Sequence, residues 1–319
     1  MTAHRLTAAP ETVHWGFLSA ELAPVLRIAS GDIVTFDTVS GSAADLPPPG
    51  LGTVRSELSA IHRAHSPAPG PHILTGPVFV EGARPGDLLK VEILEMALRD
   101  DWGFNIIQPG KGALPDDFAQ RTLAHFAIDR QGGRIATPWG ATLAASPFFG
   151  IIATAPRPTD GLLTSVVPGY FGGNIDNRDL TAGATLYLPV SVEGALLSVG
   201  DGHGTQGDGE VCLTAVETGL TGRLRISVIP GAASDAPRAE TATHLIAMAF
   251  DEDLDVAVVA ALRQAVALVV EASDLTREEA YMLISIAGDV RITQLVNVKK
   301  GVHVMIPKAA MTSASKEED

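Results

Sequence analysis

Residues 200–210 hold the densest group of chemically active side chains in the sequence. Four of them, Asp201, His203, Asp208 and Glu210, alternate with small residues, most of them glycine. In an extended chain alternate side chains share a face, so Asp201 is expected beside His203, and Asp208 beside Glu210. Imidazole and carboxylate groups together are a ligand set for divalent metals, and glycines let the backbone close around an ion. We therefore expect Asp201 and His203 to bind a metal.

The two later carboxylates of this run are expected to be catalytic. Glu210 is our candidate for the base that takes a proton from water and returns it to a leaving group. Asp208 is expected to orient His203 or to complete the metal shell, since imidazole ligands usually have such a partner. Taken alone, Asp208 is equally typical of a solvated acidic turn.

Two other segments are expected to line a substrate pocket. Asn174 and Asp176 are two apart in a polar loop at residues 172–178, and His72 precedes an apolar run. Asn and Asp are also ordinary turn formers, and a lone histidine beside a strand is commonly structural. The pocket role of these three residues depends on their meeting the 200–210 run in space.

The sequence contains none of the common nucleophile or phosphate motifs. We find no convincing Gly-x-Ser-x-Gly elbow, Walker loop or Gly-x-Gly-x-x-Gly turn that opens a helix. The single cysteine, Cys212, lies in an apolar run at residues 210–213 that we interpret as a buried strand. These features favour metal-activated water over a side-chain nucleophile.

The elements that must hold these residues are predicted to be strands. Between residues 13 and 220, short β-branched runs alternate with Gly, Pro, Asp and Asn clusters. Gly-Asp turns at residues 31, 86 and 207 each precede a predicted strand. The segment 77–83 is echoed at 189–195, and each copy continues to a Gly-Asp turn and a strand. The second copy has the longer turn, which we interpret as an inserted loop that carries Asp201 and His203.

The C-terminal part has a different pattern. Apolar residues at helical spacing predict an amphipathic helix over 254–273, and Thr276 with Glu279 forms a capping box for a second helix that ends before Gly288. Residues 290–296 and 302–306 are predicted strands, and the polar tail 312–319 is expected to fray. The predicted fold is mainly β, with β-sandwich or barrel-like units and an internal repeat, followed by a C-terminal α+β portion. We place the boundaries at 1–125, 126–235 and 236–319.

Composition excludes several classes of function. The 319 residues include 23 basic and 37 acidic side chains, a net charge of −14, which argues against nucleic-acid binding. One cysteine excludes an intramolecular disulfide and favours a reducing compartment. The most apolar stretch, 256–270, is short and interrupted by Arg263, and residues 1–17 lack a signal-peptide core. We expect a cytoplasmic protein with no membrane partner.

Four segments of the sequence resemble a known family. The segments that carry the resemblance are 14–41, 71–94, 172–217 and 275–308, and within them the 200–210 run and the loop at 173–177 are the most specific. They are similar to the acetamidase/formamidase family of small-amide hydrolases. One departure is Gly204, where the family usually has alanine; both residues are small, so no ligand is lost.

The resemblance implies hydrolysis of a linear amide to a carboxylate and ammonia, with a divalent metal such as zinc or calcium, in a β-rich fold. Two alternatives stay open from the residues alone. One is a non-catalytic β-rich module that binds calcium, and the other is hydrolysis of a different carbon-nitrogen or ester bond. The apolar helix face favours a homo-oligomer, for which we expect a dimer.

Overall fold

The molecule is built on one large, mostly antiparallel sheet. In the computed structural model, which describes residues 1–232 and 234–311, this sheet has the order β1 (Ala3–Leu6), β5 (Asp32–Asp37), β17 (Leu220–Ile229), β7 (Leu88–Leu98), β15 (Thr185–Pro189), β18 (Arg238–Glu240), β19 (His244–Asp251), β21 (Lys300–Pro307), β20 (Asp289–Gln294). Only the β1–β5 pair is parallel among these described strands. The large sheet takes strands from all three predicted segments of the chain, whose boundaries stay a prediction.

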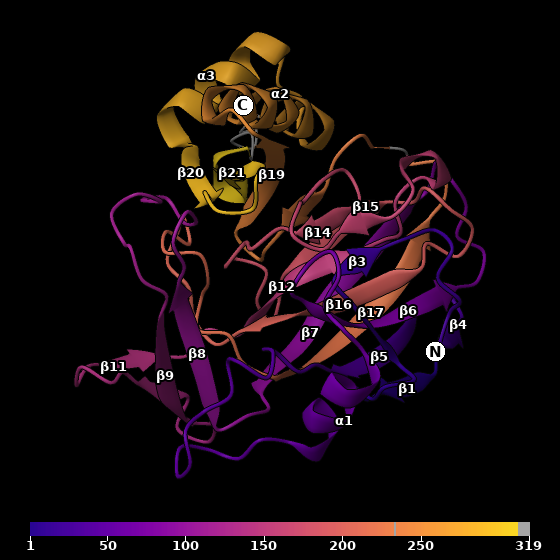
Figure 1. Ribbon diagram of the computed structural model, residues 1–319. Coiled ribbons are helices and arrows are strands. Elements are labelled where there is room, and N and C mark those ends of the chain that lie inside the picture. Colours follow the sequence, from indigo (N-terminus) through magenta and orange to yellow (C-terminus); the bar gives the residue numbers. More distant parts are fainter. Residues whose placement is uncertain (233, 312–319) are drawn as a thin grey trace.

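A second sheet packs against the large one. Its order is β14 (Gly172–Asn174), β12 (Phe148–Ala153), β16 (Leu197–His203), β6 (Ile73–Val80) and β2 (Val13–Trp15), with β4 (Leu26–Ile28) parallel to β6. Buried side chains of both sheets meet in one core, for example Phe36 and Leu224 from the large sheet and Val78, Ile152 and Val199 from the second. The predicted mainly β fold with C-terminal helices is confirmed (Figure 1).

A protruding hairpin sheet lies to one side of this sandwich. It consists of β8 (Trp102–Ile107), β9 (Thr122–Asp129), β10 (Arg134–Ala136) and β11 (Thr142–Ala144). Short elements complete the described fold. Strand β3 (Phe17–Leu18) pairs with β13 (Leu163–Thr164), α1 spans Ser56–Ala64, and 3₁₀ turns lie at Pro158–Asp160 and Lys308–Ala310. Figure 1 shows β8, β9 and β11 at the lower left, away from the helices.

Two helices cover the end of the large sheet. α2 (Leu254–Ala272) packs on β19 and β21 through Ala257, Ala261 and Ala265, whose small side chains allow close approach, and α3 (Arg277–Ala287) packs against α2 and β21 (Figure 1). The predicted capping box is present, with Thr276 and Glu279 bonding each other's backbone N–H. No single helix among the described residues is long and apolar enough to cross a membrane; α2 and α3 pass that test only as a pair bent by 114°. The predicted frayed tail lies outside the described residues.

The internal echo corresponds to two chain segments that lie side by side. The first copy leads from β6 across to β7, and the second leads from β15 back to β16. Their turns are hydrogen-bonded reciprocally, with Gly194 N donating to the carbonyl of Ala83 at 2.9 Å and Val80 N donating to that of Gly194 at 2.9 Å. Each copy therefore carries the chain from one sheet to the other.

Two details of the predicted scaffold are wrong. The supposed inserted loop is strand β16 itself, every residue of which is buried. Its glycines serve close packing, because a Cβ on Gly200 would lie 2.5 Å from the carbonyl oxygen of Ile73. The strand predicted after Gly207 is irregular chain, since Glu210 and Leu213 have positive φ angles of 46° and 127°. Cys212 is accordingly only half-buried and lies outside any strand.

Candidate metal centre

Strand β16 delivers the first two functional side chains. Asp201 and His203 are both buried and project to one side, with Asp201 Oδ2 3.4 Å from His203 Nε2. Asp201 has a positive φ of 55°, a conformation that Asp tolerates better than most residues. The structure thus brings together the two residues that the sequence predicts as metal ligands.

Three more carboxylates surround the same imidazole nitrogen. From His203 Nε2 the distance is 3.1 Å to Glu217 Oε1, 3.9 Å to Glu210 Oε1 and 3.9 Å to Asp176 Oδ1. Asp176 follows β14, and both glutamates lie in the irregular segment between β16 and β17, Glu210 near its middle and Glu217 near its end. All three side chains are buried. We refer to Asp176, Asp201, His203, Glu210 and Glu217 as the acidic centre.

Glu217 was missed by sequence reasoning, and Asp176 was placed in the pocket rather than among the ligands. Glu217 stands between Val216 and Thr218, outside the 200–210 run that holds the predicted ligands. The available signal was an acidic residue inside an apolar run, which needs a partner if it is buried. Sequence alone does not say what that partner is.

Gly150 makes room for the acidic centre. It lies on β12 opposite the bend of β16, and a Cβ at this position would be 2.4 Å from Asp176 Oδ1, 2.7 Å from Asp201 Oδ2 and 2.8 Å from His203 Cε1. Any larger residue would therefore displace three of the five side chains. Nothing in the local sequence around residues 148–153 indicated this role.

The centre fits a divalent cation. Ligand atoms that share one ion at about 2.0–2.3 Å lie roughly 3–4 Å apart, as these atoms do. Two groups within it, Asp176–His203–Glu210 and Asp201–His203–Glu217, each have ligand atoms within 4.8 Å of one another. Asp176 Oδ1, Glu210 Oε2 and both ring nitrogens of His203 are buried without a hydrogen-bond partner. Such atoms are costly unless an ion or ligand satisfies them.

The electrostatics of the centre support the same conclusion. Burial raises the pKa of Asp176 to about 6 and that of Glu217 to about 8, and burial with the nearby Asp176 charge raises the pKa of Glu210. Burial opposes ionisation of Asp201 too, but His72 and His203 lower its pKa. Burial would lower the pKa of His203, yet Glu217 and Asp201 raise it. A bound cation relieves this repulsion among the carboxylates.

Neighbouring groups hold the ligands in place. Asn297 Nδ2 donates to Asp176 Oδ2, Gln206 Nε2 donates to the Asp176 carbonyl at 2.8 Å, and Ala215 N donates to Glu217 Oε1 at 3.0 Å. The ring of Phe148 meets the His203 ring edge-on, with centroids 4.9 Å apart. These contacts fix the orientation of the ligands.

The remaining predicted residues are divided between the centre and the surface. His72 Nε2 lies 3.8 Å from Asp201 Oδ2, and its Nδ1 is 2.9 Å from Ser165 Oγ. Asn174 is buried beside the centre, and its carbonyl accepts from Asn297 Nδ2 at 3.2 Å. Asp208 departs from expectation: its carboxylate pairs with Arg291 at 2.6 Å, because the irregular chain turns it away from His203.

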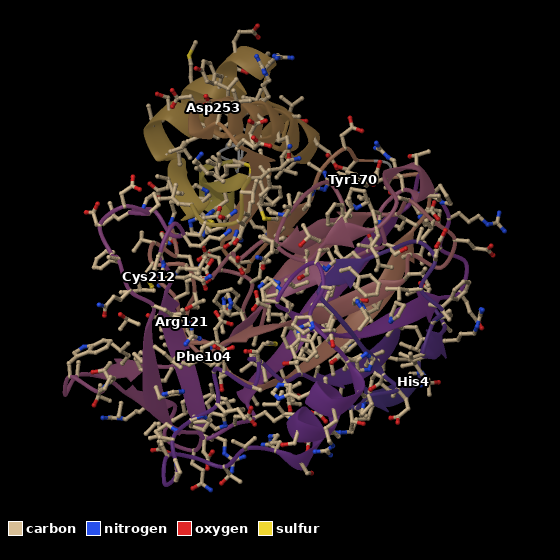
Figure 2. The ribbon with its side chains drawn as sticks, in the orientation of Figure 1. His4, Phe104, Arg121, Tyr170, Cys212 and Asp253 are labelled. Carbon is tan, nitrogen blue, oxygen red and sulfur yellow. The ribbon has the colours of Figure 1, made fainter. Side chains whose placement is uncertain are left out.

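One side of the centre opens into a groove of about 500 Å³. Of the five members of the centre, Glu210 is the one that lines it, together with Gln206. The rest of the lining comes from the hairpin sheet, from residues 205–216 and from Arg178. Cys212 is among them; it lies against β8, where Asn105 Nδ2 is 3.1 Å from its Sγ (Figure 2).

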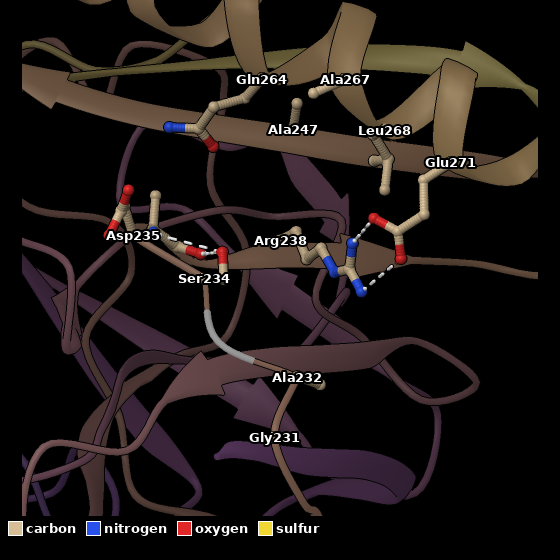
Figure 3. Close-up of a pocket in the computed structure, with 11 residues that line it drawn as sticks. Gly231, Ala232, Ser234, Asp235, Arg238, Ala247, Gln264, Ala267, Leu268 and Glu271 are labelled. Atoms are coloured by element: carbon tan, nitrogen blue, oxygen red, sulfur yellow. Dashed lines mark hydrogen bonds and ion pairs between the residues drawn. The ribbon is translucent and has the colours of Figure 1, made fainter. Parts of the chain in front are cut away.

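A separate cavity of about 440 Å³ lies between α2 and the chain before β18 (Figure 3). Arg238 and Glu271 form a bidentate ion pair there, with the shorter contact at 2.5 Å. The cavity shares no residue with the acidic centre. Of these two cavities, the groove is the one that shares a residue, Glu210, with the acidic centre.

The structure is a mostly β sandwich that buries a histidine among four carboxylates, a set of side chains that could hold a metal ion, and the family follows from comparison with known sequences. The profile of the Acetamidase/Formamidase family matches residues 52–165 and 160–312. The chain belongs to this family.

Individual relatives agree with this assignment. The chain is 33% identical over 210 residues to a formamidase of Methylophilus methylotrophus and 29% identical over 219 residues to an acetamidase of Mycolicibacterium smegmatis. The alignment with the formamidase covers 49% of this chain and 51% of the relative, and the alignment with the acetamidase covers 50% and 54%. The chain thus spans about half the length of these curated relatives. The crystal structure of an acetamidase from Bacillus halodurans superposes with a TM-score of 0.82 at 33% identity, covering 95% of this chain and 97% of that one.

Proposed function

We propose that the protein hydrolyses short linear amides to a carboxylate and ammonia. Family membership supports the reaction type, and the formamidase and acetamidase relatives support the substrate class. The observation that carries the proposal is the acidic centre, whose one groove-lining member is Glu210. It provides a buried ligand set, one residue of which also lines the space that a substrate would enter.

Asp176, Asp201, His203 and Glu217 would hold a divalent ion, for which zinc and calcium are our two candidates. Histidine favours zinc, whereas the four carboxylates also suit a harder cation. Such an ion, when bound, polarises a carbonyl oxygen and lowers the pKa of a coordinated water. His72 supports Asp201 from the side of β6.

Glu210 is the proposed base and proton carrier. Its Oε2 is buried without a hydrogen-bond partner at the groove wall, and its pKa is raised by burial and by Asp176. In the reaction Glu210 accepts a proton from the attacking water and gives it to the amide nitrogen, so that the carbon-nitrogen bond breaks and ammonia leaves. Asn174, with its buried and unpartnered Oδ1, is proposed to accept a hydrogen bond from the substrate nitrogen.

Ammonia release after metal removal tests this proposal. We expect protein stripped with a chelator, and the His203→Ala variant, to lose about a hundredfold or more in kcat/KM for formamide and acetamide. Elemental analysis of the purified protein identifies the ion. Cys212→Ala tests the alternative of a thiolate nucleophile: Cys212 lines the groove but lies outside the acidic centre, so the variant should still hydrolyse formamide and acetamide.

Three results would contradict this function. Full activity after metal removal would disprove the metal mechanism, and loss of all turnover in Cys212→Ala would indicate a thiolate nucleophile. Bound calcium without ammonia release from any short amide would favour the non-catalytic module. Hydrolysis of esters in place of amides would keep the mechanism and change the substrate.

We further propose a homodimer in the cytoplasm. Apolar side chains on the outer face of α2 and α3, including Val259, Tyr281, Met282 and Ile286, are exposed and support self-association. The single half-buried cysteine fits a reducing compartment. Cell fractionation tests the location.

A further inference from the structure

We propose that the groove beside Glu210 binds the acyl substituent of the amide, and that this substituent is an aromatic or bulky apolar group. This inference rests on the proposed amidase function and narrows its substrate class. It assigns Trp139, at the rim of the groove, as the residue that selects the substituent.

The size of the groove is the first observation. Its volume of about 500 Å³ falls within the range of about 300–1,000 Å³ that is typical of sites for drug-sized ligands. Formamide and acetamide would fill a small fraction of it. Glu210 belongs to both the groove wall and the acidic centre, so a substrate whose carbonyl lies at the centre has room for a substituent in the groove.

The chemistry of one wall is the second observation. Phe126, Trp139, Leu143, Ala144 and Val216 all line the groove. Two of these lining residues, Phe126 and Val216, also belong to a buried apolar cluster with Ile128 and Ile135. This wall is therefore a firm apolar surface, which suits a hydrocarbon substituent.

Trp139 is held at the rim by its own turn. The turn between β10 and β11 is closed by Thr137, whose N–H donates to the Ala141 carbonyl at 2.8 Å and whose Oγ1 accepts from Ala141 N at 2.8 Å. The Trp139 ring meets Phe126 edge-on at a centroid distance of 5.7 Å, yet the residue remains 68% exposed. A positioned aromatic ring with this much free surface can stack on a ligand.

The facing wall is irregular chain that is tied to the hairpin sheet. Asn105 on β8 donates from Nδ2 to the Thr214 carbonyl at 2.8 Å, and Ile106 N donates to Thr214 Oγ1 at 3.0 Å. Val211, on the same wall, is 58% exposed. Both walls thus offer apolar surface and are joined to each other through β8.

Three charged residues, Glu210, Asp208 and Arg178, belong to the groove lining. Glu210 is buried at the acidic centre, and Asp208 is paired with Arg291. Arg178 is exposed and lines the groove as well. A cationic substituent would meet Arg178, so a neutral apolar group is the better match.

Kinetics on matched amides test the inference. For the metal-loaded protein we expect kcat/KM for 2-phenylacetamide to exceed that for acetamide about tenfold or more. Trp139→Ala should lower this ratio about five- to twentyfold. Leu162→Ala, which removes a similarly exposed apolar side chain outside the groove lining, should leave the ratio unchanged. A wild-type preference for acetamide, or an unchanged ratio in Trp139→Ala, would overturn the assignment.

Binding of the product acids separates this inference from the amidase proposal. By calorimetry, phenylacetate should bind at least about tenfold more tightly than acetate, and Trp139→Ala should remove most of that difference. If no amide is hydrolysed but this pattern holds, the amidase function fails and the groove assignment stands. If amides are hydrolysed but phenylacetate binds no better than acetate, the groove assignment fails. A change in subunit association in Trp139→Ala, with the ratio unchanged, would assign Trp139 to an interface.

Discussion

Four carboxylates converge on His203, and Gly150 provides the space that this arrangement needs. The three short distances from a Cβ at Gly150 involve Asp176, Asp201 and His203, which are buried and packed on every side. Side chains in such a site have no free volume into which they can move. The exact placement of the ligands therefore depends on a residue that has no chemistry of its own.

Replacing that glycine tests the geometry of the centre. We expect Gly150→Ala to lower the bound metal per chain and to reduce kcat/KM about tenfold or more, because the added methyl displaces the ligands. Metal content and ammonia release measure the two effects. Gly204→Ala, one residue past the end of β16, is the control, since its Cβ would meet the flexible end of Ile135 at 3.0 Å. Equal metal content in both variants would show that the centre tolerates crowding.

Strand β16 and the irregular segment after it each supply two side chains of the acidic centre. The strand supplies Asp201 and His203 with fixed spacing, whereas the segment supplies Glu210 and Glu217 from positions that no regular element could bring together. The segment is held by backbone pairing of Gly209 with Thr293 and Leu295 at the edge of β20. The C-terminal strands thus help to position the proposed base.

The outer face of α3 is the element-scale feature that bears on assembly. Ile286 is 82% exposed, and we expect Ile286→Asp to shift sedimentation from dimer towards monomer because a charge would be buried at the interface. Leu162→Asp, on an exposed loop elsewhere, should leave the mass unchanged. A wild-type protein that is monomeric at high concentration would contradict the dimer.

At the scale of the whole molecule, ion pairs connect the C-terminal strands to the sandwich. Arg291 on β20 donates to Asp179 at 3.0 Å, and His303 Nε2 on β21 lies 3.3 Å from the same carboxylate. Asp179 follows β14 and Asp176 closely, so this contact joins the helix-covered end of the large sheet to the neighbourhood of the acidic centre.

This contact makes a pH-dependent contribution to stability. The His303 imidazole and then Arg291 lower the pKa of Asp179, although partial burial opposes the shift. A carboxylate whose pKa is lower in the folded state stabilises it above the unfolded value of about 3.9, and this gain is lost as the pH falls through the folded value. We expect Asp179→Asn to lower Tm by roughly 2–4 °C at pH 7, with the gap closing below about pH 4.

Calorimetry at several pH values measures that gap. Asp274→Asn, at an exposed position in the turn between α2 and α3, is the control and should leave Tm close to that of the wild type at each pH. A gap for Asp179→Asn that is constant down to pH 3 would mean that the residue acts through packing and not through its charge.

Local patterns in the sequence were sufficient for features that depend on neighbours along the chain. The two helices and the capping box at Thr276 follow from spacing and short-range hydrogen bonding, and Asp201 and His203 share a face because side chains alternate along a strand. The mainly β class follows from the same reasoning. These features need no knowledge of what packs against them.

Tertiary structure alone decided the composition of the site. Glu217 contacts His203, and Asp208 pairs with Arg291. The missing side chain of Gly150 leaves room for three ligands. These contacts form because chain segments remote in sequence meet across two sheets. Glycines in β16 looked like turn formers, yet they permit strands to approach closely. The sequence by itself determined which residue types were available for chemistry. Packing selected which of them meet, since a buried charge is stable only where its partners are brought to it.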